Sequence, residues 1–188
     1  TSVRRYQLFQ RLAIKNILCY TSSMKCASVA IIGRPSAGKS TLVNTICESK
    51  VSITSPTPQT TRNAIRGIYT DTRGQLIFTD TPGYHLSEKG FNQRMQEIAV
   101  SSLEETDAVV YLVDATRSPG AEEDAISYML SGLSVPVICC INKKDMLTDK
   151  QLEAAREYLG KHMPGRQILE LSALEDDGID EILIELFK

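Results

Sequence analysis

Short apolar runs alternate along the chain with segments whose apolar residues recur at helical spacing. Mainly apolar runs without alternation predict strands that are buried on both faces. They occupy residues 27–32, 108–113, 137–141 and 168–171. Segments with apolar positions three or four residues apart predict helices between these strands. They occupy residues 41–48, 91–105, 122–130, 151–159 and 179–187.

Two further strands, at 65–69 and 75–79, flank a polar turn at 71–74 and predict an antiparallel hairpin. The remaining order, strand followed by helix, favours a mostly parallel sheet with helices on both faces. We therefore predict an α/β fold, a three-layer sandwich around a six-stranded sheet with one antiparallel edge strand. Residues 50–62 are rich in Ser, Thr and Pro and are predicted to form a loop.

The first predicted strand leads directly into a glycine loop with the pattern G-x-x-x-x-G-K-[ST], which is typical of P-loop NTPases. Its residues are Gly33, Arg34, Pro35, Ser36, Ala37, Gly38, Lys39 and Ser40, followed by Thr41. Successive backbone N–H groups and the following helix N-terminus form a positive nest for phosphates. Gly33 and Gly38 allow the tight path. Lys39 is expected to reach the β- and γ-phosphates, and the Ser40 hydroxyl to ligate Mg²⁺.

Asp80 follows the strand at 75–79 and begins the segment Asp-Thr-Pro-Gly83. A carboxylate in that place can hold Mg²⁺ through water, as a Walker-B group does. The Gly83 amide can meet the γ-phosphate, so the loop after it can sense whether that phosphate is present. The loop at 50–62 is expected to supply a second switch contact, and by spacing alone Thr60 and Thr61 are equal candidates.

The segment Asn142-Lys-Lys-Asp145 indicates the choice of base. Guanine offers N1–H and N2–H₂ as donors, which one carboxylate can accept, whereas adenine offers neither. We expect Asp145 to read guanine, Asn142 to brace the loop, and the stem of Lys143 to cover the base. The backbone N–H of Ala173, in the segment Ser172-Ala173-Leu174, is the expected partner of guanine O6.

In this order the segments resemble the translation-factor-related P-loop GTPases, and most closely the Era family. The resemblance rests on residues 33–44, 58–62, 80–85, 142–145 and 172–174, and it covers residues 26–188. The segment Pro-Gln-Thr-Thr-Arg and the His85 after Asp-Thr-Pro-Gly-Tyr favour Era over its relatives. Matching this family places the switch threonine at Thr61, as a ligand of Mg²⁺ together with Ser40 and Asp80.

The resemblance implies a GTPase that binds GTP or GDP with Mg²⁺ and hydrolyses GTP by in-line attack of water. Lys39, Thr61 and Gly83 are the expected catalytic contacts. Tyr84 stands where Ras-like proteins have a catalytic Gln, so we expect a slow intrinsic rate of ~10⁻⁴–10⁻² s⁻¹. The alternative is a nucleotide-dependent binding module of another ribosome-assembly or tRNA-modification GTPase family.

Many relatives carry Asn in place of Ser36, where it helps to hold a potassium ion at the phosphates. Serine has a shorter reach and a single hydroxyl, which argues against potassium stimulation here. The family also implies binding of 16S rRNA and the small ribosomal subunit through a C-terminal KH domain, and peripheral contact of a cytoplasmic monomer with the inner membrane. The chain stops at Lys188, where that domain is expected to begin.

Charge is distributed unevenly between the beginning and the rest of the chain. All 23 acidic residues lie after position 47, with 14 of the 21 basic residues, so residues 48–188 have no overall charge that attracts RNA. Residues 1–23 are predicted to be a basic leader ahead of a G domain at 24–188. Three interpretations of the leader stay open: a transit peptide, an amphipathic arm for a membrane or RNA, or a disordered or non-native extension before Met24.

The five cysteines, at positions 19, 26, 47, 139 and 140, show neither metal-binding spacing nor a disulfide framework. An odd number without such a pattern indicates a reduced, cytosolic compartment.

Overall fold

The structure is a computed structural model, and it describes residues 25–48, 65–79 and 100–188. The strands are β1 (Cys26–Ile32), β2 (Ile65–Asp71), β3 (Gly74–Thr79), β4 (Ala108–Asp114), β5 (Val137–Asn142) and β6 (Gln167–Glu170). The helices are α2 (Lys39–Glu48), α4 (Ala121–Ser131), the short 3₁₀ helix η1 (Lys144–Met146), α5 (Asp149–His162) and α6 (Ile179–Leu186).

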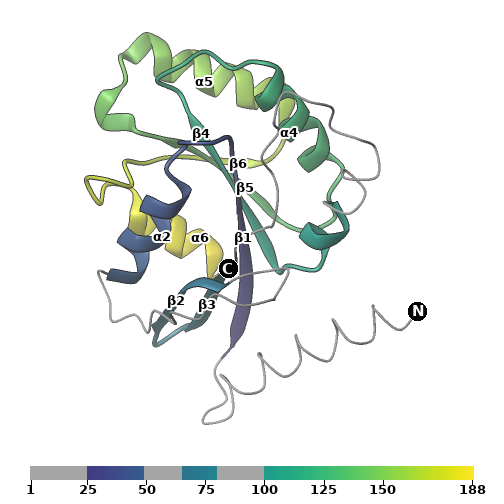
Figure 1. The fold of residues 1–188 in the computed structure, drawn as a ribbon, viewed down its shortest axis with the longest axis vertical. Coiled ribbons are helices and arrows are strands. Elements are labelled where there is room, and N and C mark those ends of the chain that lie inside the picture. The colour runs from purple at the N-terminus through teal and green to yellow at the C-terminus, as the bar shows by residue number, and fades with distance from the viewer. Residues whose placement is uncertain (1–24, 49–64, 80–99) are drawn as a thin grey trace.

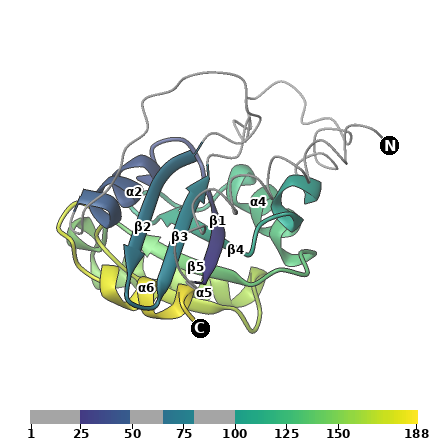
Figure 2. The same cartoon turned by 90° about the horizontal axis from the view of Figure 1, so that it is seen from below.

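The six strands form one sheet in the order β2-β3-β1-β4-β5-β6. All neighbouring pairs are parallel except β2 and β3, which form the predicted antiparallel hairpin. Figure 2 brings this hairpin to the front of the molecule. Because five strands run in the same direction, their carboxyl ends meet at one edge of the sheet, where ligands bind in open α/β sheets.

Helices cover both faces of the sheet, α2 and α6 on one side and α4 and α5 on the other (Figure 1). The side chains of β4 show how the core is divided. Val110 and Leu112 pack with α2 and α6, whereas Tyr111 and Val113 pack with α4 and α5. The predicted α/β sandwich, with its six-stranded sheet and single antiparallel edge strand, is therefore confirmed.

The boundaries differ from the predicted ones by a few residues, for local reasons. The helix predicted at 41–48 begins at Lys39, because the phosphate loop itself winds into the first turn of α2. The helix predicted at 151–159 extends over α5, which begins where Thr148 and Gln151 cap each other in a capping box. Residues 100–104 are helical, in agreement with the prediction for 91–105.

Some predictions fall outside the described residues. They are the leader at 1–23, the loop at 50–62, and the segment that contains Asp80 and Gly83.

Candidate functional site

The phosphate loop connects β1 to α2 at the carboxyl edge of the sheet (Figure 1). Two glycines are required by close packing. A Cβ on Gly33 would overlap the Leu112 carbonyl oxygen, and one on Gly38 would overlap the Asn142 side chain. Gly38 also has a φ of +96°, which L-residues rarely adopt. The loop can therefore follow this path only with glycine at both positions.

The Lys39 ammonium lies inside the curve of this loop. Its Nζ donates to the carbonyl oxygens of Gly33, at 2.7 Å, and Arg34, at 2.8 Å. The first turn of α2 contains no acidic residue, so the positive end of the helix dipole is not offset there. Together these features place a cation and a helix N-terminus at the position where the sequence predicts phosphates.

The other predicted loop residues differ in exposure. Pro35, Ser36 and Ser40 are exposed, Thr41 is half-buried, and Ala37 is fully buried. Ser36 has a positive φ of 64°. The exposed hydroxyl of Ser40, next to Lys39 in the first turn of α2, is the kind of oxygen donor that Mg²⁺ prefers.

Asn142, the last residue of β5, joins the phosphate loop to the segment at 172–174, which is called the base loop below. Its Nδ2 donates to the Ala37 carbonyl at 2.8 Å, and its Oδ1 accepts from the Ala173 amide at 3.0 Å. The side chain is 2% exposed. Asn142 thus joins two segments, at Ala37 and at Ala173, that are far apart in the sequence.

Ala173 has both of its main-chain polar groups engaged. Besides the bond from its amide to Asn142, its carbonyl accepts from the Thr45 hydroxyl on α2 at 2.6 Å. The sequence predicts this amide as the partner of guanine O6. In the structure that N–H is used to hold the loop, so a bond to O6 would have to share it or replace the bond to Asn142.

Lys143 adopts a left-handed backbone conformation, with a φ of 65°, directly after β5. Its Nζ donates to Asp114 Oδ2 at 2.7 Å. The register of the sheet explains this contact, because Asp114 at the end of β4 pairs with Asn142 at the end of β5. This contact fixes the charged end of Lys143, whose aliphatic stem is predicted to cover the base.

Asp114 is 4% exposed, and its oxygens accept from Lys143 and from the Thr116 amide and hydroxyl. Burial alone would raise the pKa of this carboxyl, but the hydrogen bonds from Lys143 and Thr116 outweigh it and hold the pKa below its usual range. Asp114 is thus an ionised anchor, and it is missing from the residues that the sequence singled out.

Asp145, the predicted reader of guanine, is exposed in η1, and Leu174 is 73% exposed. The two loops that carry them are tied side by side. The Lys144 amide donates to the Leu171 carbonyl at 3.2 Å, and Lys144 Nζ lies 2.8 Å from Asp177 Oδ2. Ser172 is 1% exposed and its hydroxyl accepts from the Glu175 amide, which shapes the turn.

The side chain of Arg34 turns away from the phosphate loop. Its Nη2 donates to the Asp114 carbonyl at 2.7 Å, and its Nη1 lies 2.7 Å from Glu123 Oε1 on α4. Any contact of Arg34 with a phosphate is therefore left to its backbone. Glu123 is a second residue that the sequence did not single out. A charged residue on the apolar face of a predicted helix was the available signal.

The remaining predicted site residues, Thr61, Asp80 and Gly83, lie outside the described residues. Within the described part of the chain there is no group of three or more His, Cys, Asp or Glu side chains that could hold a metal ion. No helix within those same ranges is long and apolar enough to cross a membrane.

The family described as "50S ribosome-binding GTPase" matches residues 28–143. That span is more than half of the chain, so the chain belongs to this family of P-loop GTPases.

Within this family the chain is similar to GTPase Era. It is 51% identical to GTPase Era of Treponema denticola over 167 residues, which are 88% of this chain and 57% of the relative. GTPase Era of Borrelia turicatae is 43% identical, and 57% of its length is matched. The chain therefore spans somewhat more than half the length of these curated relatives.

Two solved structures of Era lead to the same conclusion. A variant of the Aquifex aeolicus protein bound to GDP and AlF₄⁻ superposes with a TM-score of 0.66 at 37% identity, covering 87% of this chain and 56% of that one. Era in complex with MgGDPNP and nucleotides 1506–1542 of 16S ribosomal RNA superposes with a TM-score of 0.67 at 36% identity, with the same coverage. The resemblance to Era predicted from the motifs is confirmed.

Proposed function

We propose that the chain is the G domain of an Era-type GTPase, which binds GTP or GDP with Mg²⁺ and hydrolyses GTP. The single observation that carries this proposal is the double hydrogen bond of Asn142 to Ala37 and Ala173. It holds the phosphate loop and the base loop at fixed positions in one site. Such a site fits a ligand that has phosphates at one end and a purine at the other.

The roles of the residues follow from their positions. The phosphate-loop amides and Lys39 bind the phosphates and offset the charge that develops there during hydrolysis. Asp145 selects guanine, and Lys143 covers the base while Asp114 holds its ammonium group. Ser40, with Thr61 and Asp80, would hold Mg²⁺, which when bound supplies positive charge at the β- and γ-phosphate oxygens.

The rate of hydrolysis is expected to be slow. Tyr84 stands where Ras-like proteins have a catalytic Gln, and the one arginine of the phosphate loop, Arg34, is engaged with α4. Positioning and electrostatic stabilisation are then the main contributions of this chain to catalysis.

Base selection is the sharpest test of the proposal. Asp145→Asn is expected to weaken GTP binding by roughly 10²–10³-fold, because the Asn oxygen can accept from only one guanine donor while its NH₂ group faces the other. The same variant is expected to gain affinity for xanthosine triphosphate, because the amide of Asn can donate to the 2-oxo group. Asp149→Asn is the matched control, since Asp149 is also exposed and lies four residues further on. Affinities of Asp145→Asn for GTP and for xanthosine triphosphate that both equal those of the parent would reject Asp145 as the reader of the base.

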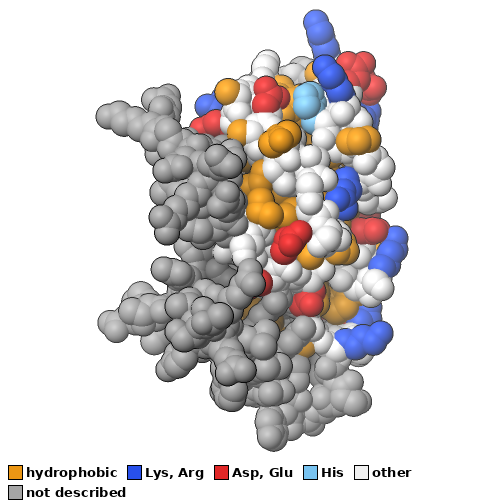
Figure 3. Space-filling model, turned by 90° about the vertical axis from the view of Figure 1, so that its right-hand side faces the viewer, with side chains coloured by type: hydrophobic (Ala, Val, Ile, Leu, Met, Phe, Trp, Pro, Cys, Tyr) orange, Lys and Arg blue, Asp and Glu red, His pale blue; other side chains and the backbone are white. Residues whose placement is uncertain are grey.

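For the full-length protein we propose binding of 16S rRNA and a role with the small ribosomal subunit, supported by the relative solved with 16S rRNA. The described residues give no broad basic surface on the side of α4 and α5, where acidic and basic side chains are interspersed (Figure 3). We place the main RNA contact in the C-terminal KH domain that the family implies, and the mixed charge of this one face does not oppose that. A gel-shift titration with a 16S rRNA segment at two salt concentrations tests this, and tight, salt-resistant binding by the chain from Met24 would contradict it.

Five further expectations stay predictions. They are the alternative family, the membrane contact, the monomeric state, the cytoplasmic location and the weak response to potassium.

A further inference from the structure

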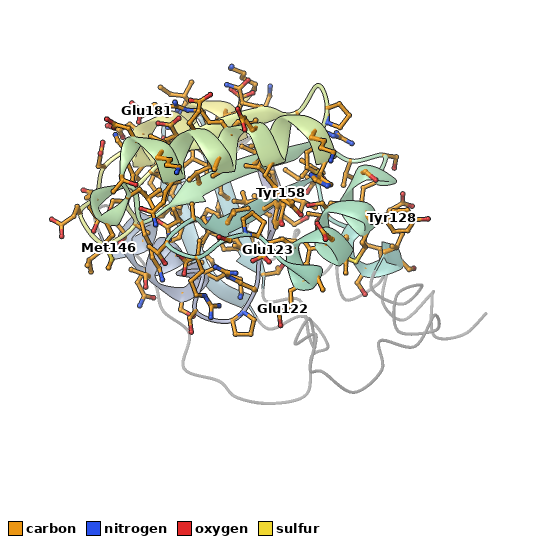
Figure 4. The ribbon with its side chains drawn as sticks, turned by 90° about the horizontal axis from the view of Figure 1, so that it is seen from above. Glu122, Glu123, Tyr128, Met146, Tyr158 and Glu181 are labelled. Carbon is orange, nitrogen blue, oxygen red and sulfur yellow. The ribbon has the colours of Figure 1, made fainter. Side chains whose placement is uncertain are left out.

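The start of helix α4 reaches into the interior and contacts the phosphate loop through one ion pair. Glu123 is 3% exposed and Arg34 is 6% exposed, so both charged groups are removed from water. Glu122, the neighbour of Glu123 on the same helix, points away from the body of the domain (Figure 4). Two adjacent glutamates in one helical turn therefore have different environments, and only one of them can act on the site.

Each oxygen of the Glu123 carboxylate has a separate function. Oε2 accepts from the Gly120 amide at 2.9 Å and so caps the N-terminus of α4. Oε1 lies 2.7 Å from Arg34 Nη1, at ion-pair distance but without the alignment of a hydrogen bond. Arg34 Nε has no acceptor among the described residues. The guanidinium is therefore held by the Asp114 carbonyl and by two buried carboxylates, of which Glu123 at 2.7 Å is nearer than Asp114 at 4.0 Å.

The backbone of Arg34 connects this ion pair to the reactive end of the loop. The Arg34 carbonyl accepts from Lys39 Nζ at 2.8 Å and from the Ala37 amide at 3.3 Å. The Arg34 carbonyl is one of two that hold the Lys39 ammonium, the other being that of Gly33. Fixing the Arg34 side chain therefore helps to fix where that ammonium group lies. The order of contacts is Glu123, the Arg34 side chain, the Arg34 carbonyl, and Lys39.

Stability alone does not explain such an arrangement. Removing two charges from water costs several kcal/mol per ion, and a buried pair often adds little compared with apolar residues of similar size. Leaving one charge without its partner, in contrast, is strongly destabilising. A buried pair that does not add stability is better explained by the position it imposes on its neighbours, and here the neighbour is the phosphate loop.

We propose that Glu123 is a positioning residue for nucleotide binding, which sets the phosphate loop and Lys39 through Arg34. This inference rests on the proposed function, because it assigns Glu123 to the same nucleotide site. Glu123 touches no nucleotide itself. Its removal is expected to lower phosphate affinity while leaving the reading of the base by Asp145 intact.

The test compares four variants of the complete chain with the parent. Glu123→Gln keeps an acceptor for the Gly120 amide and removes the charge. Arg34→Met combined with Glu123→Gln removes both charges, so no buried ion is stranded. Glu123→Asp keeps the charge but shortens its reach. Glu122→Gln is the matched control, because the neighbouring Glu123, and not Glu122, is the glutamate that accepts from the Gly120 amide and pairs with Arg34.

Affinity for fluorescent GDP and thermal unfolding without nucleotide are measured for each protein. We expect Glu123→Gln and the pair variant to bind GDP about tenfold more weakly than the parent, and Glu122→Gln to bind as the parent does. The pair variant is expected to melt closer to the parent than Glu123→Gln does, while its GDP affinity stays low. The preference for GTP over xanthosine triphosphate is expected to be unchanged in Glu123→Gln.

Three outcomes would overturn the inference. The first is parent-like GDP affinity in the pair variant. The second is a GDP affinity that follows the melting temperature across the whole set, since that would make Glu123 purely structural. The third applies if neither Glu123→Gln nor the pair variant folds. In that case Glu123→Asp decides, and a GDP affinity equal to that of the parent would overturn the inference.

A failure of the proposed function would look different. In that case the parent and Glu122→Gln would not bind GDP at all. If the parent binds GDP and the Glu123 variants bind it equally well, only the positioning role is lost.

Discussion

Replacing Asn142 by alanine removes the clamp between the phosphate loop and the base loop in a single step. The side chain makes two hydrogen bonds, to the Ala37 carbonyl and from the Ala173 amide. Ala37 is 0% exposed and Ala173 is 1% exposed, so water cannot reach these groups without a rearrangement. The substitution therefore strands one buried acceptor and one buried donor.

The magnitude follows from these two groups. A buried polar group left without its partner costs about 1–3 kcal/mol, so two of them cost about 2–6 kcal/mol of the free energy of unfolding. Domains are typically stable by about 5–15 kcal/mol, so this is a large share of the total. A water molecule that enters the space left by the side chain would bring the loss toward the lower end.

Urea unfolding of the nucleotide-free chain measures the loss directly. The slope of the unfolding free energy against urea concentration should be unchanged, since the surface exposed on unfolding is nearly the same. Asn44→Ala is the control, because Asn44 is exposed on α2 and alanine suits a helix. A loss below about 1 kcal/mol for Asn142→Ala would refute the argument that both groups depend on Asn142.

Asn142→Asp separates the two bonds. The carboxylate keeps an acceptor for the Ala173 amide but places an oxygen against the Ala37 carbonyl, where the amide nitrogen donated before. At neutral pH we expect this variant to be at least as unstable as the alanine variant. Protonation at low pH gives the carboxyl a donor again, so part of the difference from the parent should disappear.

Two further predictions concern ionisation of buried groups. The pKa of Asp114 is lower in the folded state, so its contribution to stability is present above the unfolded pKa of about 3.9 and is lost as the pH falls through the folded pKa. The stability difference between the parent and Asp114→Asn should therefore shrink between pH 6 and pH 3 in urea unfolding, and a constant difference would contradict this. Burial raises the pKa of Cys139 to about 12 and that of Cys140 as well. At pH 8 iodoacetamide should therefore modify these thiols only after unfolding, as peptide mass mapping would show; labelling of Cys139 in the folded chain at the rate of half-buried Cys26 would contradict it.

Much of the fold could be predicted because its signals are local. Buried strands such as β4 and β5 are continuous apolar runs, and each ends at a polar residue, Asp114 and Asn142. Parallel strands bring these ends to one edge, so the motifs and the sheet edge were expected to coincide. The predicted helices shifted by a few residues because caps such as Thr148 with Gln151 extend them beyond their apolar positions.

The contacts between motifs could not be predicted in the same way. Asp114 meets Lys143 because β4 and β5 pair in a register that aligns Asp114 with Asn142, and the sequence contains no signal for that register. The Ala173 amide was assigned to the base because of its segment. Its bond to Asn142 appears only once the two loops are placed side by side.

Arg34 and Lys39 show why residue type and position in a motif do not determine a role. Both are cations in the same loop, and both were expected to contact the nucleotide because they belong to the phosphate-loop motif. Lys39 keeps its charge within the loop, held by two carbonyls, whereas the charge of Arg34 is neutralised by Glu123 inside the domain. A buried cation with a buried anionic partner contributes little net field to a bound phosphate, because the fields of the two opposite charges largely cancel beyond the pair itself. On the proposed function, Lys39 is therefore the cation that the loop offers to phosphates, whereas Arg34 is paired inside the domain.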